Sequence, residues 1–183
     1  MLAFYTIWFS QRNGSTLLCK GLESSKVLGH PGEIFNLNGS KSLISKYEAK
    51  DYSHLQEIIY RLGSGSNGVF GIKTNAPKKE DDPIINELKL LPVVKDNSPS
   101  GNISNFAVWE KIFPNGKHIF LTRRNKVRQA VSWWKAIVTN EWHRKQGDSP
   151  KLPIENISGK YDFAAIKHLL IEISMRRALK YSV

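Results

Sequence analysis

The sequence predicts an α/β fold in which a mostly parallel central sheet is flanked by helices. Apolar, β-branched runs of strand length alternate with helical stretches, and the order strand, loop, helix occurs twice. The 183 residues are enough for one buried core but too few for two ordinary domains. We therefore expect a single domain over residues 1–183.

Composition narrows the classes of protein to consider. No apolar run approaches the roughly 20 residues that cross a bilayer, and Cys19 is the only cysteine, so no disulfide can form within the chain. The start of the chain also lacks the features of a secretory signal, so we expect a cytoplasmic setting. The formal charge of +11 favours an anionic partner: a nucleic acid, an anionic lipid or a charged nucleotide.

The first strand leads into a loop with the features of an anion site. Residues 3–10 are rich in aromatic and β-branched side chains, and QRNGST follows at residues 11–16, where helical spacing begins. Gly14 allows the backbone to approach an anion closely, and Ser15 and Thr16 supply hydroxyls and the free amides of a helix start. Arg12 adds a positive charge. An ordinary turn with a serine cap explains the short pattern equally well, and the lysine of a Walker A loop is absent.

The middle of the chain predicts a helix, a strand and a polar stretch. Leucine and isoleucine form an amphipathic stripe over residues 55–62, and a glycine-rich connection leads to a strand at 69–72 that closes on Lys73. Residues 76–102 are mostly polar, so we expect them on the surface, with one helical turn near residues 84–88.

The second strand, loop and helix pattern follows a predicted helix at 103–113 and a turn at 114–116. A strand at 118–122 precedes a helix with apolar spacing from Val127 to Val138, and a long last helix begins near Phe163 and runs almost to the end of the chain.

Helical spacing places a cationic, hydroxyl-bearing face on the helix after the second loop, with Arg124, Arg128, Ser132 and Lys135. A phosphate could lie between that face and the arginines at the strand end, Arg123 and Arg124. The sequence does not distinguish which arginine points inward. A solvated basic face explains the same pattern.

Four segments, in order, resemble one family. Residues 11–18 (QRNGSTLL) look like the 5′-phosphosulfate loop of sulfotransferases that use 3′-phosphoadenosine 5′-phosphosulfate (PAPS), in particular the bacterial trehalose 2-sulfotransferase-like family. Residues 123–134 (RRNKVRQAVSWW) resemble that family's 3′-phosphate motif, and residues 30–36 and 67–73 resemble two further segments. Asn13 stands where the family usually has serine.

The resemblance implies a P-loop-like three-layer fold and transfer of a sulfuryl group from PAPS to a hydroxyl acceptor, with a carbohydrate or glycolipid as the leading expectation. It implies a general base at Glu33, with His30 the nearest alternative, and charge stabilisation by Arg12. Lys73 would assist at the donor or acceptor, although a solvent-facing lysine at the end of a strand explains its position equally well. The residues expected to bind the nucleotide are Arg12, Asn13, Gly14, Ser15, Thr16, Arg123, Arg124 and Ser132.

Partners and cofactors follow from the same reasoning. Sulfuryl transfer does not require a metal, and no His, Cys or carboxylate cluster has metal-ligand spacing, so we expect none. Similar proteins continue for several tens of residues beyond this chain, so we expect part of the site to be missing or to come from another chain, which leaves a homodimer open. We expect a small-molecule or glycan acceptor and no nucleic acid.

Three other functions compete with this interpretation. A nucleic-acid-binding module would use the basic charge and Trp133, Trp134 and Trp142, although Trp134 lies on the apolar helix face, which favours core packing. A nucleotide kinase of related fold is disfavoured by the missing Walker A lysine. A non-catalytic relative would bind the nucleotide without turning it over.

Overall fold

The structure, a computed structural model, describes residues 3–75, 82–96, 103–143, 147–149, 151 and 159–179. Two compact units divide the chain. Met1–Phe9, Ser15–Leu121 and Val183 form the first unit, and Ser10–Gly14 and Thr122–Ser182 form the second unit. The single domain expected over residues 1–183 stays a prediction.

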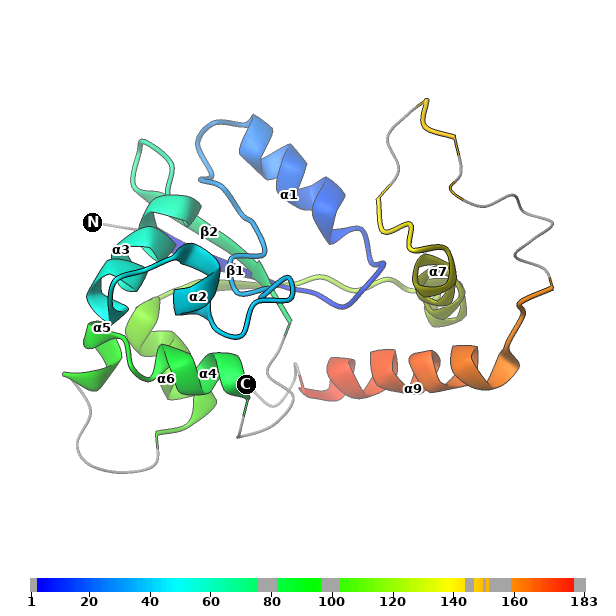
Figure 1. The fold of residues 1–183 in the computed structure, drawn as a ribbon. Helices are drawn as coiled ribbons and strands as arrows, with labels where there is room; N and C mark the ends of the chain where they lie inside the picture. The colour runs from blue at the N-terminus through cyan, green and yellow to red at the C-terminus, as the bar shows by residue number, and fades with distance from the viewer. Residues whose placement is uncertain are drawn as a thin grey trace. The chain divides into compact units, whose positions relative to one another are not determined.

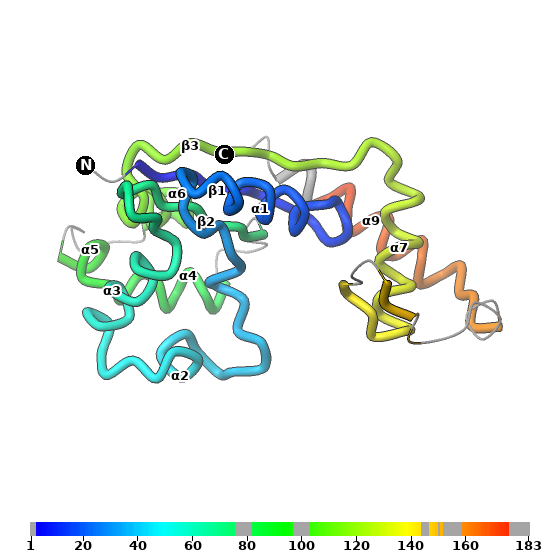
Figure 2. The backbone as a smooth tube through the Cα atoms, turned by 90° about the horizontal axis from the view of Figure 1, so that it is seen from above, coloured from blue at the N-terminus to red at the C-terminus, as the bar shows by residue number. Residues whose placement is uncertain are grey.

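A three-stranded, fully parallel sheet is the centre of the first unit. The strands are β1 (Ala3–Trp8), β2 (Val69–Thr74) and β3 (Lys117–Phe120), and β1 runs between the other two, as Figure 2 shows from above. All three predicted strands are therefore present, and the α/β class with a parallel sheet is confirmed.

The two faces of the sheet are covered by different helices. On one face, Tyr5 and Ile7 pack with Cys19 of helix α1 (Ser15–Ser24). On the other face, Trp8 and residues of β2 pack into the main core with the helices described below. Because side chains alternate along a strand, β1 serves both faces, and the first unit has three layers (Figure 1).

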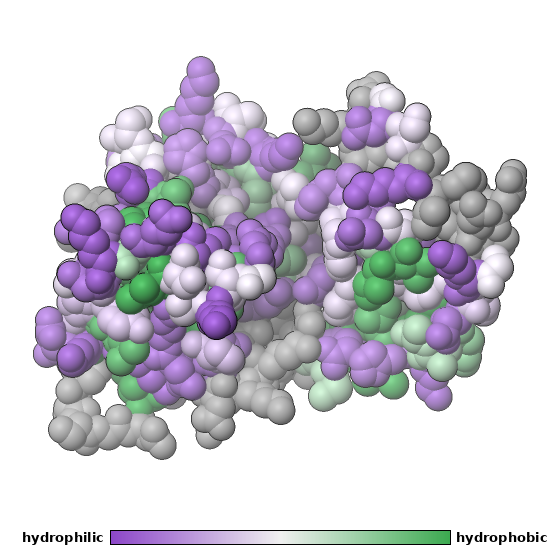
Figure 3. Space-filling model, in the orientation of Figure 1, coloured by the Kyte–Doolittle hydropathy of each residue, from purple (hydrophilic) through white to green (hydrophobic). Residues whose placement is uncertain are grey.

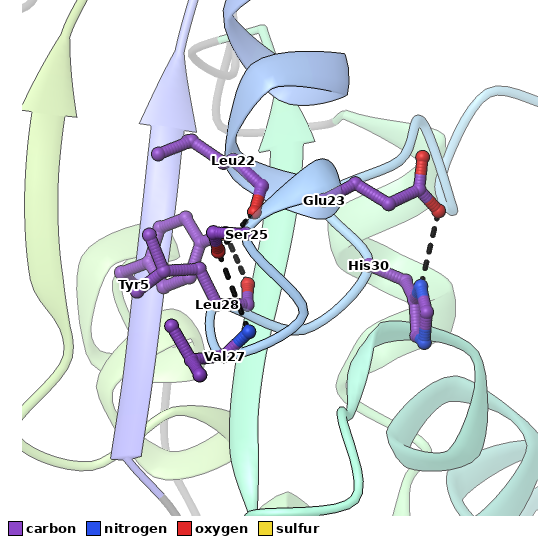
Figure 4. A network of polar contacts seen from close by, with 7 residues as sticks. All are labelled: Tyr5, Leu22, Glu23, Ser25, Val27, Leu28 and His30. Atoms are coloured by element: carbon purple, nitrogen blue, oxygen red, sulfur yellow. Dashed lines mark hydrogen bonds and ion pairs between the residues drawn. The ribbon is translucent and has the colours of Figure 1, made fainter.

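One register position in the sheet has no room for a side chain. Tyr5 lies opposite Gly71 in the pairing of β1 with β2. A Cβ atom at Gly71 would lie 2.4 Å from the Tyr5 ring and from its hydroxyl oxygen. The Tyr5 hydroxyl donates a hydrogen bond to the Leu28 carbonyl oxygen at 2.6 Å, and Figure 4 draws this contact. The bond holds the ring opposite Gly71.

Five helices supply the second layer of the main core. They are α2 (Leu43–Tyr47), α3 (Tyr52–Gly63), α4 (Pro83–Leu88), α5 (Pro92–Lys95) and α6 (Asn105–Ile112). Every one of them contributes at least one buried apolar side chain to this core, including Leu43, Leu55, Leu88, Val94 and Trp109. The helices α3 and α6 were predicted, whereas α2 and α5 were not.

Two expectations about exposure were wrong. The prediction of a surface stretch over residues 76–102 fails in its described part, because Ile85, Leu88, Leu91 and Val94 are fully buried or nearly so. Prolines at the first turns of α4 and α5 start two short helices there, which turn isolated apolar residues inward. Leu62, at the end of the predicted stripe, is exposed. Residues 76–81 and 97–102 lie outside the described residues.

The second unit contains the helix pair α7 (Lys126–Thr139) and α9 (Phe163–Leu179). They pack through a shared apolar cluster of Ala130, Trp133, Trp134, Ile166, Leu169 and Ile173. The predicted apolar face of α7 starts later than expected, because Val127 is exposed. Hydrophobic surface is visible over α7 and α9 in Figure 3, and α9 exposes Phe163, Ile171 and Met175.

Helix α9 ends at Leu179, and residues 180–183 lie outside the described residues. In the described ranges, none of the helices combines the length and apolar character required to cross a membrane.

Candidate active site

Lys73 is the centre of a polar cluster in the first unit, at the carboxyl end of β2. Its side chain is only 6% exposed, and its Nζ lies 2.8 Å from Oε1 of Glu33. The same Nζ donates to the Thr16 hydroxyl at 3.2 Å and lies 4.9 Å from the centre of the Phe9 ring. The structure thus brings together three predicted site residues that are far apart in sequence. Carboxyl ends of parallel strands are where α/β folds bind ligands.

Backbone contacts and a neighbouring amide fix the position of Glu33. The Lys73 amide donates to the Gly32 carbonyl oxygen at 2.9 Å, so the segment before Glu33 runs parallel to β2. The Asn36 side chain donates from Nδ2 to Oε2 of Glu33 at 3.0 Å. Both carboxylate oxygens therefore have a partner, while the side chain is 35% exposed and stays accessible to an acceptor.

The backbone just after Glu33 is held by helix α2. The Lys46 ammonium and the Tyr47 hydroxyl both donate to the Ile34 carbonyl oxygen at 2.7 Å. Burial lowers the pKa of Lys46, and the nearby charge of Glu33 opposes this shift. Our sequence analysis missed Asn36, Lys46 and Tyr47. The short α2 carries a serine N-cap, Ser42, which is the one local signal that could have indicated it.

In the second unit, Arg12 is held by three contacts. Its Nε donates to the Ser132 hydroxyl at 3.0 Å, and its Nη1 donates to the Trp142 carbonyl oxygen. The Arg12 carbonyl oxygen accepts a hydrogen bond from Nη1 of Arg123 at 3.4 Å. Arg12 and Ser132, predicted from two separate motifs, are therefore direct partners.

The backbone of the loop over residues 10–14 is unusual at two positions. Arg12 has a φ of 62° and Gly14 a φ of 94°, both in the left-handed region. A Cβ at Gly14 would meet nothing within 4 Å, so its positive φ, not crowding, is the reason for glycine there. Asn13 is half-buried between them. After the loop, α1 begins in the first unit with buried Ser15 and half-buried Thr16.

The predicted 3′-phosphate residues differ in exposure. Arg123 is half-buried against the loop, as described above, and Ser132 is half-buried on α7. Arg124 is exposed, and so are Arg128 and Lys135 on α7. A cationic face is thus present, and Asn125 caps the start of its helix by accepting from the Arg128 amide at 2.8 Å.

His30, the alternative base, is directed to another carboxylate. Its Nδ1 lies 3.0 Å from Oε1 of Glu23, and both side chains are more than half exposed. Figure 4 shows the two side chains directed toward one another. Among the described residues, the two candidate bases therefore belong to separate ion pairs: Glu33 with Lys73, and His30 with Glu23.

Three further side chains bear on other functions. Cys19 is buried on the side of α1 that packs against β1, and burial raises the pKa of its thiol, while the charge of Lys73 opposes that shift. Trp133 and Trp134 are buried between α7 and α9, which confirms the core role predicted for Trp134. Neither ring is exposed enough for a nucleic-acid base to stack on it.

No group of three or more His, Cys, Asp or Glu residues that could hold a metal occurs in the described ranges.

Comparison with known proteins gives the class to which this fold and these residues belong. The chain belongs to the Stf0 sulphotransferase family, whose family model matches residues 4–178. It is similar to the trehalose 2-sulfotransferase of Mycolicibacterium smegmatis (strain ATCC 700084 / mc(2)155), with 28% identity over 198 residues that cover 95% of this chain and 68% of that protein. The resemblance inferred from the four sequence segments is thereby confirmed.

Proposed function

We propose that this protein transfers the sulfuryl group of PAPS to a hydroxyl group of a carbohydrate. The observation that carries the proposal is the position of Lys73. Its buried ammonium contacts Thr16, at the helix start that resembles the 5′-phosphosulfate loop, and Glu33, the expected base. One cation thus joins a donor-binding residue to an acceptor-activating residue.

In the proposed reaction, the acceptor oxygen forms a bond to sulfur while the bond between sulfur and the 5′-phosphate oxygen breaks. Glu33 takes the proton of the acceptor hydroxyl. The bonding electrons of the broken bond go to the phosphate, so 3′-phosphoadenosine 5′-phosphate leaves with an added negative charge. Lys73 and Arg12 stabilise that charge, since fixed cations act most strongly where charge develops.

Nucleotide recognition is assigned to residues of both motifs. Main-chain and hydroxyl donors for the 5′ end come from Asn13, Gly14, Ser15 and Thr16. The 3′-phosphate is bound by Arg123, Arg124 and Ser132, because guanidinium groups and hydroxyls match phosphate oxygens. Arg123, which is half-buried against the loop, is the better-anchored of the two arginines.

The carbohydrate acceptor is supported by the name of the similar protein, a trehalose 2-sulfotransferase. Glu33 is 35% exposed, as an acceptor-activating base requires. We propose a sugar hydroxyl, with trehalose as the first acceptor to test.

The test is transfer of radioactive sulfate from labelled PAPS to trehalose and to a panel of other sugars. We expect labelled sugar and an equal amount of 3′-phosphoadenosine 5′-phosphate. The Lys73→Met variant should lose about 10²-fold or more of this activity. Lys20→Met is the matched control, because Lys20 is an exposed lysine on α1 and should leave the rate unchanged.

The outcome separates the competing functions. Nucleotide binding without transfer to any sugar would identify a non-catalytic nucleotide-binding protein. A protein that neither binds the nucleotide nor transfers sulfate would overturn the proposal.

A further inference from the structure

Gln129, the fourth residue of α7, is a fully buried amide with 0% of its surface exposed. Its Nε2 donates two hydrogen bonds to the loop before Arg12, to the Ser10 hydroxyl at 2.9 Å and to the Gln11 carbonyl oxygen at 2.7 Å. These contacts join residues that are more than 100 positions apart in the sequence. Gln129 therefore connects α7 to the loop over residues 10–14 within the second unit.

The carbonyl oxygen of the Gln129 side chain, Oε1, makes this residue unfavourable as a buried packing residue. Oε1 of Gln129 is buried and has no hydrogen-bond partner among the described residues. A buried polar atom without a partner destabilises a fold, and an apolar side chain of the same size would avoid that cost at this position. Packing alone does not explain a glutamine here.

The amide orientation is fixed by its partners. The Gln11 carbonyl oxygen can only accept, so Nε2 has to face it and Oε1 has to face away. An inverted amide would place two oxygens 2.7 Å apart at this contact. The two donated bonds are therefore the contribution of Gln129 to the loop.

Gln129 and Ser132 act on consecutive loop residues. They lie three positions apart on α7 and so on neighbouring parts of one helix face. Gln129 holds Ser10 and Gln11, and Ser132 accepts from the Arg12 guanidinium.

The Arg12 backbone needs such support. Its φ of 62° is in the left-handed region, which a residue with a side chain occupies only when its surroundings impose it. The residues on its N-terminal side are held by Gln129, and its own carbonyl oxygen is held by Arg123.

We propose that Gln129 is a positioning residue for Arg12. It fixes the backbone at Ser10 and Gln11 so that Arg12 keeps its left-handed conformation and presents its guanidinium beside Ser132. The effect on sulfuryl transfer rests on the proposed function. The effect on the loop does not, because it follows from the contacts alone.

The first experiment is limited proteolysis with trypsin, which cleaves after arginine. The Gln129→Met variant keeps the length of the side chain but loses both donors. We expect cleavage between Arg12 and Asn13, identified by sequencing the new N-terminus, to become about tenfold faster, since loosening the loop lowers the cost of local opening. Cleavage at other sites should keep its parent rate.

Two further variants keep the test decisive. Ser10→Ala removes one of the two bonds with a smaller change to the core, so it should accelerate the same cleavage by a few-fold. Ser174→Ala is the matched control, because its exposed hydroxyl bonds to the Leu170 carbonyl oxygen within α9 and does not reach the loop. It should leave cleavage after Arg12 unchanged.

The second experiment is a double-mutant cycle of Gln129→Met with Arg12→Ala, read out as the dissociation constant of 3′-phosphoadenosine 5′-phosphate and as kcat. If Gln129 acts through Arg12, Gln129→Met should cost about tenfold in the parent and less than about twofold in the Arg12→Ala background. Equal losses in both backgrounds, or unchanged cleavage after Arg12, would overturn the proposal. If no sulfate is transferred but cleavage accelerates, the proposed function fails and the positioning role stands.

Discussion

At the scale of single residues, Glu33 is bound on both oxygens by Lys73 and Asn36, and this arrangement gives a sharp expectation for its replacement. Glu33→Gln keeps the shape of the side chain but cannot accept a proton. Turnover should fall by roughly 10²- to 10⁴-fold, the usual contribution of a positioned base. Nucleotide affinity should stay within about threefold. Single-turnover transfer and calorimetric binding on the same preparation measure the two quantities.

Glu23→Gln provides the control for that change. Glu23 is also a carboxylate paired with a basic side chain, His30, at 3.0 Å in the first unit. The Glu23→Gln variant should keep the parent activity. If Glu33→Gln transfers sulfate within about threefold of the parent rate, Glu33 is not the base, and His30 becomes the residue to replace.

Whether a residue of the candidate site could be predicted from the sequence depends on whether a local motif or a distant contact explains it. Arg12, Glu33, Lys73 and Ser132 could be predicted because each stands in a local motif that resembles the family. Gln129 could not, since the reason for a buried amide there is a loop more than 100 positions earlier. Three-dimensional contacts, not local pattern, define such supporting residues.

At the scale of elements, β1 carries a group whose ionisation should govern stability at high pH. Burial raises the pKa of Tyr5 to about 12, and nearby Cys19 adds to the rise. The folded state therefore keeps the Tyr5 proton more tightly than the unfolded state does. Its contribution to the free energy of unfolding is complete below about pH 10 and is lost as the pH rises towards 12.

The prediction is a comparison of the parent with Tyr5→Phe. Between pH 9 and pH 11 the parent should lose more unfolding free energy than the variant, with a difference of about 1 kcal/mol. Urea unfolding at both pH values measures it. Burial also raises the pKa of Tyr47 and Tyr60, so both proteins should lose some stability, and only the difference reports Tyr5. Identical pH dependence would contradict this assignment.

Elements with strong periodicity or turn signals could be predicted, and the short helices α2 and α5 could not. The strands, α3 and α7 follow clear apolar patterns. Helix α5 has four residues, too few for any helical repeat, and it is stabilised by burial of Val94 in a core made by other segments. The burial of the apolar residues in 83–96 therefore depends on that core and cannot be predicted from their local spacing.

At the scale of the whole molecule, charge is divided unequally. The second unit has 14 Lys and Arg against 5 Asp and Glu, which is +9 of the total +11. This is also the unit that contains Arg12, Arg123, Arg124 and Ser132. The anionic partner expected from composition is therefore expected mainly at this unit.

This distribution predicts strong, salt-sensitive stabilisation by the product nucleotide. At about one hundred times its dissociation constant, 3′-phosphoadenosine 5′-phosphate should raise the melting temperature by about 5 °C or more. Adenosine 5′-monophosphate, which lacks the 3′-phosphate, should give a clearly smaller shift at the same concentration. Salt at about 0.5 M should reduce the first shift more than the second, because it screens more charge pairs. Equal shifts for both nucleotides would remove the 3′-phosphate from the recognised groups.

The register of Tyr5 opposite Gly71 also limits how the sequence can diverge. Any side chain at position 71 would collide with the Tyr5 ring, and the ring cannot turn away without losing its bond to the Leu28 carbonyl oxygen. A smaller residue at position 5 alone should destabilise the protein because it leaves a cavity. A larger residue at position 71 alone should destabilise it because it overpacks the sheet. Relatives that have gained a side chain at position 71 should therefore carry a smaller residue at position 5, and the two positions should vary as a pair.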